Sequence, residues 1–367
     1  MIPLVDLSIQ QEEIESEVRA GWDRVLRHSG YVLGPEVKAF EDAFASFTGV
    51  AHCVGVANGT DALELALRAI DVGPGAEVIL PANSFVATAF AVERAGAKPV
   101  LVDIDPFTYL ISPSDVKLRL GASTRAVMPV HLYGQLAPLE ELGAITGPRD
   151  VAIVEDAAQA QGARRHNRHA GYTSVAAGVS FYPGKNLGAY GDAGAVLTMS
   201  ESVGERVRKL RNYGGEEKYE HVELGFNSRL DSLQAVVLSA KLARLDRWNQ
   251  ARQRAAALYD ELLADMPNVV LPVTLAGNEH VWHLYVVRVP RRDQVLERMR
   301  ADGVGVGIHY PTPIHLCPAF AHLGHGPGEF PIAEEASRTI LSLPLYPGIT
   351  EAQQRAVAGA LQRALDE

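Results

Sequence analysis

Cysteine is scarce in this sequence of 367 residues. Only Cys53 and Cys317 occur, without CxxC spacing and without a cluster of metal ligands beside them. This scarcity argues against a disulfide scaffold and against a zinc site, because both need several cysteines or histidines at short, regular spacing. We expect two reduced, partly buried thiols and no bound metal.

Long apolar runs and basic excess are also missing. No uncharged apolar stretch reaches the ~20 residues that a membrane-spanning helix needs, and the opening residues turn acidic and helical instead of forming a basic and apolar signal. The net charge of -10 disfavours general binding to nucleic acid or anionic membranes. We therefore expect a soluble, cytoplasmic protein in which any anionic substrate meets a local basic patch.

Regular alternation of strands and helices is what the first two-thirds of the sequence does contain. Such alternation predicts an α/β layer, with a mostly parallel sheet covered by helices on both faces. Ligands bind at the carboxyl ends of the strands in sheets of this kind. The expected strands are 52–57, 77–81, 99–103, 125–129, 151–155, 175–182 and 194–199, and the expected helices between them are 61–70, 86–95 and 136–145.

The pattern changes after a polar stretch at 214–229. Apolar spacing then predicts a long helical segment over 232–263. Because the chain is also long for one domain, we expect a large α/β domain at 1–235 and a small α+β domain at 236–367. The expected elements of the small domain are strands 283–289 and 305–310 and helices 292–301, 333–340 and 351–365.

Lys185 is unusual among the seven lysines. It lies in a Gly-rich loop between two strands that both read as buried. Burial would disfavour its ammonium form and lower its pKa, and a free amine condenses with an aldehyde to form a Schiff base. Local sequence alone leaves open an ordinary loop lysine that points to water.

Asp156 ends the hydrophobic strand 151–155, where a parallel sheet presents side chains to a ligand. A carboxylate there can pair with the pyridinium nitrogen of pyridoxal phosphate. The alternative is a helix N-cap. Glu155 is the other candidate acid, but strand alternation directs neighbouring side chains to opposite faces.

Asn58-Gly59-Thr60-Asp61 follows an apolar strand and opens an amphipathic helix. Free N–H groups and the helix dipole favour an anion at such a junction, and glycine lets the backbone approach a phosphate closely. Plain N-capping by Thr60 or Asp61 is the alternative. No GxGxxG fingerprint occurs at this turn, which disfavours a dinucleotide-binding dehydrogenase.

Three further side chains follow strand ends. Phe85 is placed to stack on a flat cofactor, although a core position would explain it equally well. Gln159 lies within a turn of Asp156 and can hydrogen-bond a phenolic oxygen. Ser180 can donate to a phosphate.

Taken together, these motifs resemble the DegT/StrS group of sugar aminotransferases, which are fold-type I pyridoxal-phosphate enzymes. The resemblance runs almost from end to end. It rests on the ordered set Asn58-Gly-Thr-Asp, Glu155-Asp-Ala-Ala-Gln159 and Ser180-Phe-Tyr-Pro-Gly-Lys185. It implies a fold-type I transferase with pyridoxal phosphate as cofactor, converted to pyridoxamine phosphate in the second half-reaction.

The resemblance also implies roles for individual residues. Lys185 would carry the Schiff base and later move the proton, while Asp156 pairs with the ring nitrogen. Asn227 would reach the phosphate of a neighbouring subunit, which implies a homodimer with shared active sites. The remaining implied cofactor contacts are Gln159 to the ring hydroxyl, Phe85 stacked on the ring, and Gly59, Thr60 and Ser180 on the phosphate.

Finer features resemble the subgroup that aminates C3 of dTDP-linked 3-keto-6-deoxyhexoses. Tyr182 stands where many C4-aminating relatives carry histidine, and Gly191-Asp-Ala-Gly replaces their Gly-Glu-Gly-Gly. Relatives that dehydrate sugars carry histidine in place of Lys185. The expected substrates are glutamate and a dTDP-linked keto sugar, with substrate contacts from Tyr182, Lys218, Arg229, His309 and Tyr310.

Other readings stay open from the sequence. The same chemistry can aminate C4 or C2 of another keto sugar, or a keto-cyclitol. A protein that binds the cofactor only for regulation is the alternative from a different class. An intact lysine, aspartate and phosphate junction favour turnover over such a role.

Overall fold

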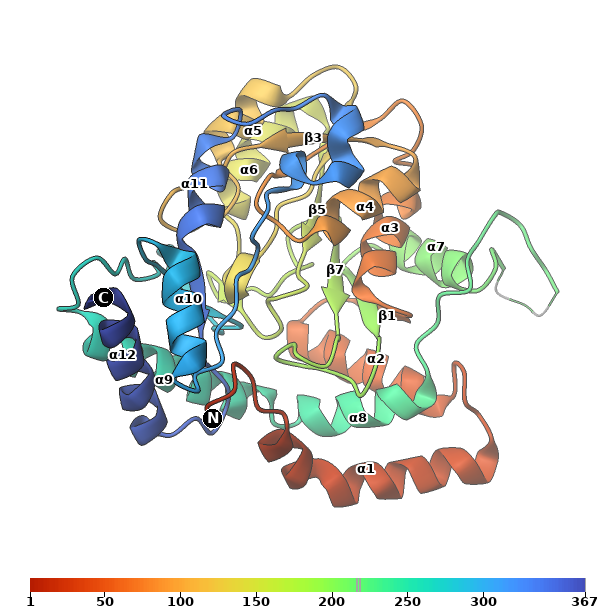
Figure 1. Ribbon diagram of the computed structural model, residues 1–367. Helices are drawn as coiled ribbons and strands as arrows, with labels where there is room; N and C mark the ends of the chain where they lie inside the picture. Colours follow the sequence, from red (N-terminus) through yellow and green to blue (C-terminus); the bar gives the residue numbers. More distant parts are fainter. Residues whose placement is uncertain (216, 218, 367) are drawn as a thin grey trace.

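The computed structural model describes residues 1–215, 217 and 219–366. Within this part of the chain, a seven-stranded sheet has the order β1-β8-β7-β5-β4-β2-β3 (Figure 1). β8 is antiparallel to both of its neighbours, and the other pairs are parallel, so the expected mostly parallel sheet is confirmed. The strands are β1 (His52–Val56), β2 (Glu77–Pro81), β3 (Lys98–Val102), β4 (Thr124–Val127), β5 (Ala152–Asp156), β7 (Ala176–Ser180) and β8 (Gly194–Thr198).

Helices cover both faces of this sheet. The strands are rich in Val, Ile, Leu and Ala and are buried on each side, as a parallel sheet between two helical layers requires. One face packs against α3 (Gly59–Ala69), α4 (Val86–Ala95) and α7 (Glu201–Arg211). The other face packs against α2 (Pro35–Thr48), α5 (Pro113–Arg119), α6 (Leu139–Thr146) and α8 (Ser232–Leu242).

A second hydrophobic core forms from the C-terminal third of the chain. It surrounds the antiparallel pair β10 (Tyr285–Arg288) and β11 (Ile340–Leu343). Its helices are α9 (Leu245–Leu263), α10 (Arg292–Ala301) and α12 (Glu351–Asp366), which lie side by side at the left of Figure 1. Residue 235 lies inside α8, and the division at that residue stays a prediction.

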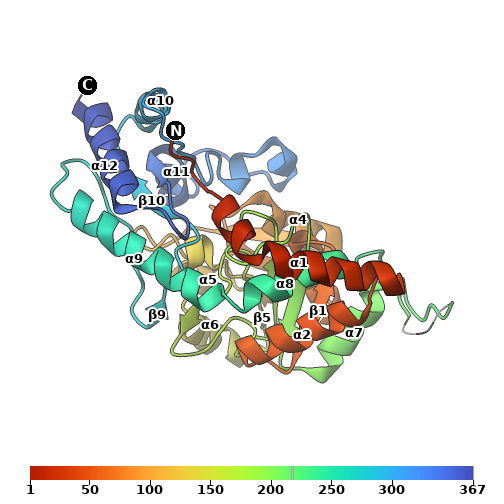
Figure 2. The same ribbon diagram turned by 90° about the horizontal axis from the view of Figure 1, so that it is seen from below.

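The remaining elements connect these two cores. α1 (Ser8–His28) lies along α8, as the view from below shows (Figure 2). α11 (Pro331–Thr339) leads into β11. Two residue pairs, β6 (Arg164–Arg165) and β9 (Asn278–Glu279), form a small antiparallel ladder. Short 3-10 turns are η1 (Leu132–Gly134), η2 (Gly147–Arg149), η3 (Ile314–Leu316) and η4 (Pro318–Leu323).

Two expected elements differ in the structure. The helical pattern over 232–263 is divided between α8 and α9 at Ala243–Arg244. There the Arg244 side chain pairs with Glu13 and Glu17 of α1, at 3.3 and 3.0 Å. The expected strand 305–310 is wrong, because only Gly307 forms a bridge, to Ser342. Val306 and Ile308, the alternating apolar residues of this segment, pack against the second core, but the segment does not pair along its length with a neighbouring strand.

Both cysteines are free thiols, as expected. Cys53 is buried and Cys317 is partly exposed. Across the described residues, none of the helices has the length and apolar character needed to cross a membrane.

Arg252 offers a test of what holds the second core together. It is 2% exposed on α9, and its Nη1 donates to the carbonyls of Trp282 and Leu345, at 3.2 and 2.9 Å. Arg252→Ala leaves both carbonyls unpaired and creates a void, so we expect a loss of about 3 kcal/mol in the free energy of unfolding. Urea unfolding at fixed protein concentration measures the change.

Arg254→Ala is the matched control, since Arg254 is exposed on the same helix. It should change the unfolding free energy by less than about 0.5 kcal/mol. Equal unfolding midpoints for the two variants would contradict the assigned role of Arg252.

Candidate active site

The carboxyl ends of the parallel strands β1, β2, β5 and β7 meet at one edge of the sheet, beside a cavity of about 740 Å³. Most of the residues singled out in the sequence line it, although they come from distant segments. Those that do are Gly59, Thr60, Phe85, Asp156, Gln159, Ser180, Tyr182, Lys185, His309 and Tyr310.

Lys185 lies in the turn that follows β7. Backbone hydrogen bonds hold this turn, from Lys185 N to Tyr182 O at 2.9 Å and from Ala189 N to Phe181 O at 2.8 Å. Burial lowers the pKa of the Lys185 amine to about 8, and the negative charge of Asp156 opposes that effect. A substantial free-amine fraction near neutral pH is what Schiff-base chemistry requires.

Asp156 is 4% exposed at the end of β5. Its carboxylate accepts from Thr88 Oγ1 at 2.7 Å and from Ala158 N at 3.1 Å. Burial raises its pKa, while these two hydrogen bonds and Lys185 act in the opposite direction. The N-cap alternative fails, because no helix begins after this residue.

Glu155 points to the opposite face, as strand alternation predicts. Its carboxylate accepts from His131 Nε2 at 2.5 Å and from Gly171 N at 2.8 Å, and Ser174 Oγ also donates to it. It does not line the cavity. Asp156 is therefore the acid of this pair that faces a ligand.

The phosphate junction forms where α3 begins against the end of β7. Asn58 caps α3 by accepting from Asp61 N at 2.8 Å, so neither Thr60 nor Asp61 is the N-cap. A Cβ added at Gly59 would lie 2.6 Å from Ser180 Cβ. Glycine therefore permits the close approach of helix and strand, and the first-turn N–H groups lack intrahelical acceptors. An anion fits this cradle.

Phe85 and Tyr310 form an aromatic pair over the cavity. Their ring centroids are 5.2 Å apart, and Phe85 is 52% exposed, which is not a core position. Gln159 Nε2 donates to the Tyr310 hydroxyl at 3.0 Å, and its Oε1 accepts from Tyr133 N at 2.7 Å. Gln159 therefore links the backbone at Tyr133 to the side chain of Tyr310.

The C-terminal third supplies the far wall of the cavity, including one residue that the sequence analysis missed. His283 and His309 both line the cavity. Burial lowers the pKa of His309 to about 4 and the pKa of His283 well below its usual range. His283 precedes β10 in an ordinary apolar strand pattern, so no motif marked it. Thr88, whose hydroxyl donates to Asp156, was also missed, because it lies within the ordinary helical pattern of α4.

Of the expected site residues that the structure describes, Asn227 and Arg229 do not line this cavity. Asn227 forms an isolated backbone bridge with Asn212. Arg229 donates to Asn212 Oδ1 at 2.9 Å and lies over the Tyr213 ring. Lys218 lies outside the described residues. The first two belong to the segment between α7 and α8, which projects from the body of the molecule (Figure 1).

A mostly parallel sheet between helices, with a half-buried lysine and an aspartate lining one cavity beside an anion cradle, defines a fold-type I pyridoxal-phosphate-dependent aminotransferase. The model of the DegT/DnrJ/EryC1/StrS aminotransferase family matches residues 11–362. The chain belongs to this family and is a pyridoxal-phosphate-dependent sugar aminotransferase.

Curated relatives match almost the whole chain. A pleiotropic regulatory protein of Geobacillus stearothermophilus is 44% identical over 97% of this chain and 96% of its own. A dTDP-3-amino-3,4,6-trideoxy-alpha-D-glucose transaminase of Streptomyces venezuelae is 44% identical over 98% and 95%. A UDP-2-acetamido-2-deoxy-3-oxo-D-glucuronate aminotransferase of Pseudomonas aeruginosa is 39% identical over 98% and 99%.

Among solved structures, that of S. venezuelae DesV in complex with a ketimine intermediate is similar throughout. It covers 100% of this chain and 99% of its own, with a TM-score of 0.98 and 44% identity. The expected fold class and the expected cofactor are therefore both confirmed.

The residues present fit pyridoxal phosphate. At the cradle, the missing Cβ of Gly59 lets the start of α3 lie against Ser180, so that first-turn N–H groups and the Ser180 hydroxyl can serve one phosphate. Asp156 is a buried carboxylate whose hydrogen-bond donors are neutral, and a protonated ring nitrogen would supply a charged one. Lys185 presents an amine to the same cavity.

Gly59→Ala tests the cradle. The added Cβ would collide with Ser180 and displace the start of α3, so we expect the Kd for pyridoxal phosphate to rise about tenfold. Equilibrium titration of the cofactor-free chain, followed by the visible absorbance of the Schiff base, measures it. Gly143→Ala is the control, because nothing lies within 4 Å of a Cβ at that α6 position. Unchanged affinity in Gly59→Ala would contradict the cradle.

Proposed function

We propose that this enzyme transfers the amino group of glutamate to C3 of a dTDP-linked 3-keto-6-deoxyhexose. The observation that carries the proposal is that Tyr182 lines the same cavity as Ser180 and Lys185. Tyrosine at this position and Gly191-Asp-Ala-Gly resemble the C3-aminating subgroup. The S. venezuelae relative, whose name gives a dTDP-3-amino sugar, supports the same assignment.

The sugar would lie between Tyr182 and the far wall. Tyr182 is 59% exposed, so its hydroxyl is accessible at the mouth of the cavity. His309 and Tyr310 line the opposite side. Burial keeps His309 neutral and raises the pKa of Tyr310, so both present uncharged hydrogen-bonding groups at neutral pH. Uncharged donors and acceptors suit sugar hydroxyls.

Pyridoxal phosphate, when bound, supplies an electron-withdrawing ring that carries the amino group between the two substrates. Asp156 would keep the ring nitrogen protonated, and Gln159 would reach the ring hydroxyl. Gly59, Thr60 and Ser180 would hold the phosphate, with Phe85 stacked on the ring. Lys185 Nζ would give up its bond to the aldehyde carbon of the cofactor in favour of the substrate amine. The freed amine would then hold and return the proton that moves between substrate and cofactor.

The diphosphate of the substrate needs cations, and few of the described residues that line the cavity carry positive charge. Of the described residues that line the cavity, only Lys185 and Arg94 carry arginine or lysine charge. Arg94 is paired with Asp61 at 3.1 Å and with Glu64 at 2.8 Å. We therefore infer that a second subunit contributes Asn227 to the cofactor phosphate and Arg229 and Lys218 to the substrate.

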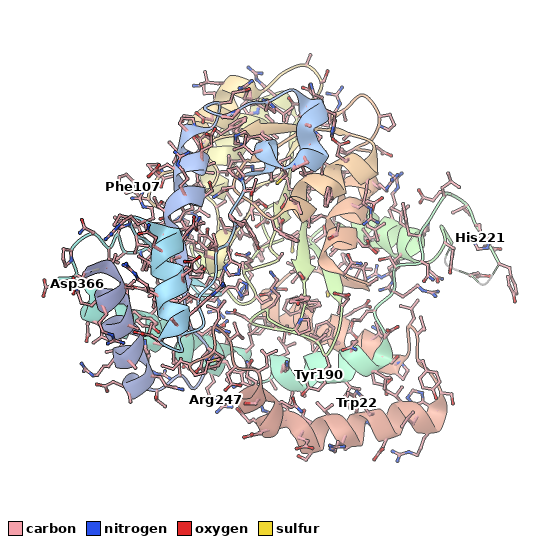
Figure 3. All side chains as sticks on the ribbon, viewed as in Figure 1. Trp22, Phe107, Tyr190, His221, Arg247 and Asp366 are labelled. Atoms are coloured by element: carbon pink, nitrogen blue, oxygen red, sulfur yellow. The ribbon has the colours of Figure 1, made fainter. Side chains whose placement is uncertain are left out.

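The projecting segment between α7 and α8 suits a subunit contact. Its described residues include Val222 and Leu224, which are 72% and 95% exposed. Exposed apolar side chains gathered on one projection are typical of surfaces that a partner covers. Figure 3 labels His221 on this projection. The proposed assembly is a homodimer in the cytoplasm, with each chain divided near residue 235.

A substrate panel tests the assigned carbon and nucleotide. Run in reverse, with 2-oxoglutarate as acceptor, a dTDP-3-amino-6-deoxyhexose should react with a kcat/KM at least about tenfold above its dTDP-4-amino isomer and its UDP-linked counterpart. The consumption of 2-oxoglutarate and the analysis of the keto-sugar product by mass spectrometry measure it. Preference for the 4-amino or the UDP-linked sugar would refute the finer assignment, without affecting the aminotransferase class.

Mixed dimers test whether active sites are shared. Lys185→Ala and Asn227→Ala chains, each weak or inactive alone, should regain activity when subunits are exchanged. In the hybrid, one site combines the intact Lys185 of one chain with the intact Asn227 of the other. About one active site per hybrid dimer is the expected yield. Absence of recovery, with subunit exchange shown by native mass spectrometry, would contradict sharing.

A further inference from the structure

His283 has a defined tautomer. Its Nδ1 lies 3.3 Å from Asn186 Oδ1. Asn186 Nδ2 donates to the carbonyl of Val281 at 2.9 Å and to Asn249 Oδ1 at 2.9 Å, which fixes Asn186 Oδ1 as an acceptor. Nδ1 of His283 must therefore carry the hydrogen. Because burial also keeps the ring neutral, Nε2 carries a free lone pair.

Lys185 and His283 offer complementary groups, an amine that donates and a ring nitrogen that accepts. Both line the same cavity. Among the described residues, the hydrogen bond of the His283 ring goes through Nδ1, which leaves Nε2 for the cavity. Asn186, which holds the imidazole, is also the next residue after Lys185.

We propose that His283 is a positioning residue for Lys185, whose amine donates a hydrogen bond to His283 Nε2 once the cofactor has taken up the amino group and the lysine has been released. The interaction holds the released amine at the wall of the cavity and directs its lone pair toward the reacting carbon. It acts in both half-reactions, because Lys185 is released in both. It does not depend on which keto sugar is the second substrate.

The charged and titratable groups around this pair come from several elements. Asp156 of β5 faces Lys185 from the sheet edge, and His309 and Tyr310 face it from the far wall. Arg252 of α9 acts on His283 from behind. Burial lowers the Lys185 pKa to about 8. An acceptor at His283 Nε2 favours the ammonium form, so its loss should lower that pKa further.

Two substitutions separate the two ring nitrogens. Asparagine at 283 reaches only the Nδ1 position, so His283→Asn can still donate to Asn186 but offers nothing at Nε2. Glutamine reaches the Nε2 position, so His283→Gln restores an acceptor toward Lys185. A purely structural role predicts that asparagine is the better replacement. The proposal predicts that glutamine is.

The first measurement uses the full-length enzyme in its pyridoxamine-phosphate form, in which the Lys185 amine is not bound to the cofactor. Competitive labelling with an acid anhydride, read by mass spectrometry of the Lys185 peptide, gives the pH at which half of the amine is free. His283→Asn should lower this pH by about one unit, the size expected for one lost hydrogen bond to a charged group. His283→Gln should stay near the parent value. Exposed Lys117 in the same sample is the internal control.

The second measurement is the single-turnover reaction of the holoenzyme with glutamate alone. His283→Asn should slow it about tenfold or more, and His283→Gln should recover most of the rate. Equal losses in both variants, a rise in the labelling pH, or a defect confined to the sugar half-reaction would each overturn the proposal. None of these results bears on the choice of sugar, which the substrate panel decides separately.

Discussion

The attraction between the Asp156 carboxylate and the Lys185 amine, which line the same cavity, is the interaction on which the site depends. Burial pushes the pKa of the lysine down and that of the aspartate up, while each charge opposes the shift of the other. The balance leaves an amine that is partly neutral and a carboxylate able to accept a proton-bearing ring nitrogen. Both depend on the fold, because β5 and the turn after β7 are neighbours in the sheet.

The same sheet keeps a second acid out of this chemistry. Glu155 precedes Asp156 by one residue, yet period-two alternation sends it to the face covered by α6. There His131 accepts at Nδ1 from Ala137 N at 3.0 Å, so its Nε2 is the nitrogen that donates to Glu155. This closed network satisfies a buried carboxylate that faces no ligand. One strand therefore supplies a reactive acid on one face and a structural acid on the other.

The sequence predicted the elements whose patterns are local. Glu77–Pro81, Val86–Ala95 and Arg292–Ala301 have the expected bounds, and the strand-end residues from Gly59 to Lys185 meet as parallel topology requires. Long-range contacts account for what was missed. The break at Arg244 coincides with ion pairs to α1, and His283 becomes part of the site only when the C-terminal third packs against the Lys185 turn. Trp22 of α1 meets Tyr190 of that turn edge-on, a contact equally invisible in the sequence (Figure 3).

The cavity is therefore a joint between two parts of the chain. Polar links that cross it include Tyr133 Oη to His309 O at 2.5 Å, Gln159 Nε2 to Tyr310 Oη at 3.0 Å, and Asn186 Nδ2 to Val281 O at 2.9 Å. Each begins beside a strand end and finishes on the C-terminal wall. Breaking a buried hydrogen bond leaves an unpaired polar group, so these links disfavour opening of the joint. The far wall can then hold uncharged imidazole and hydroxyl groups at fixed positions, which is what discrimination among sugar hydroxyls requires.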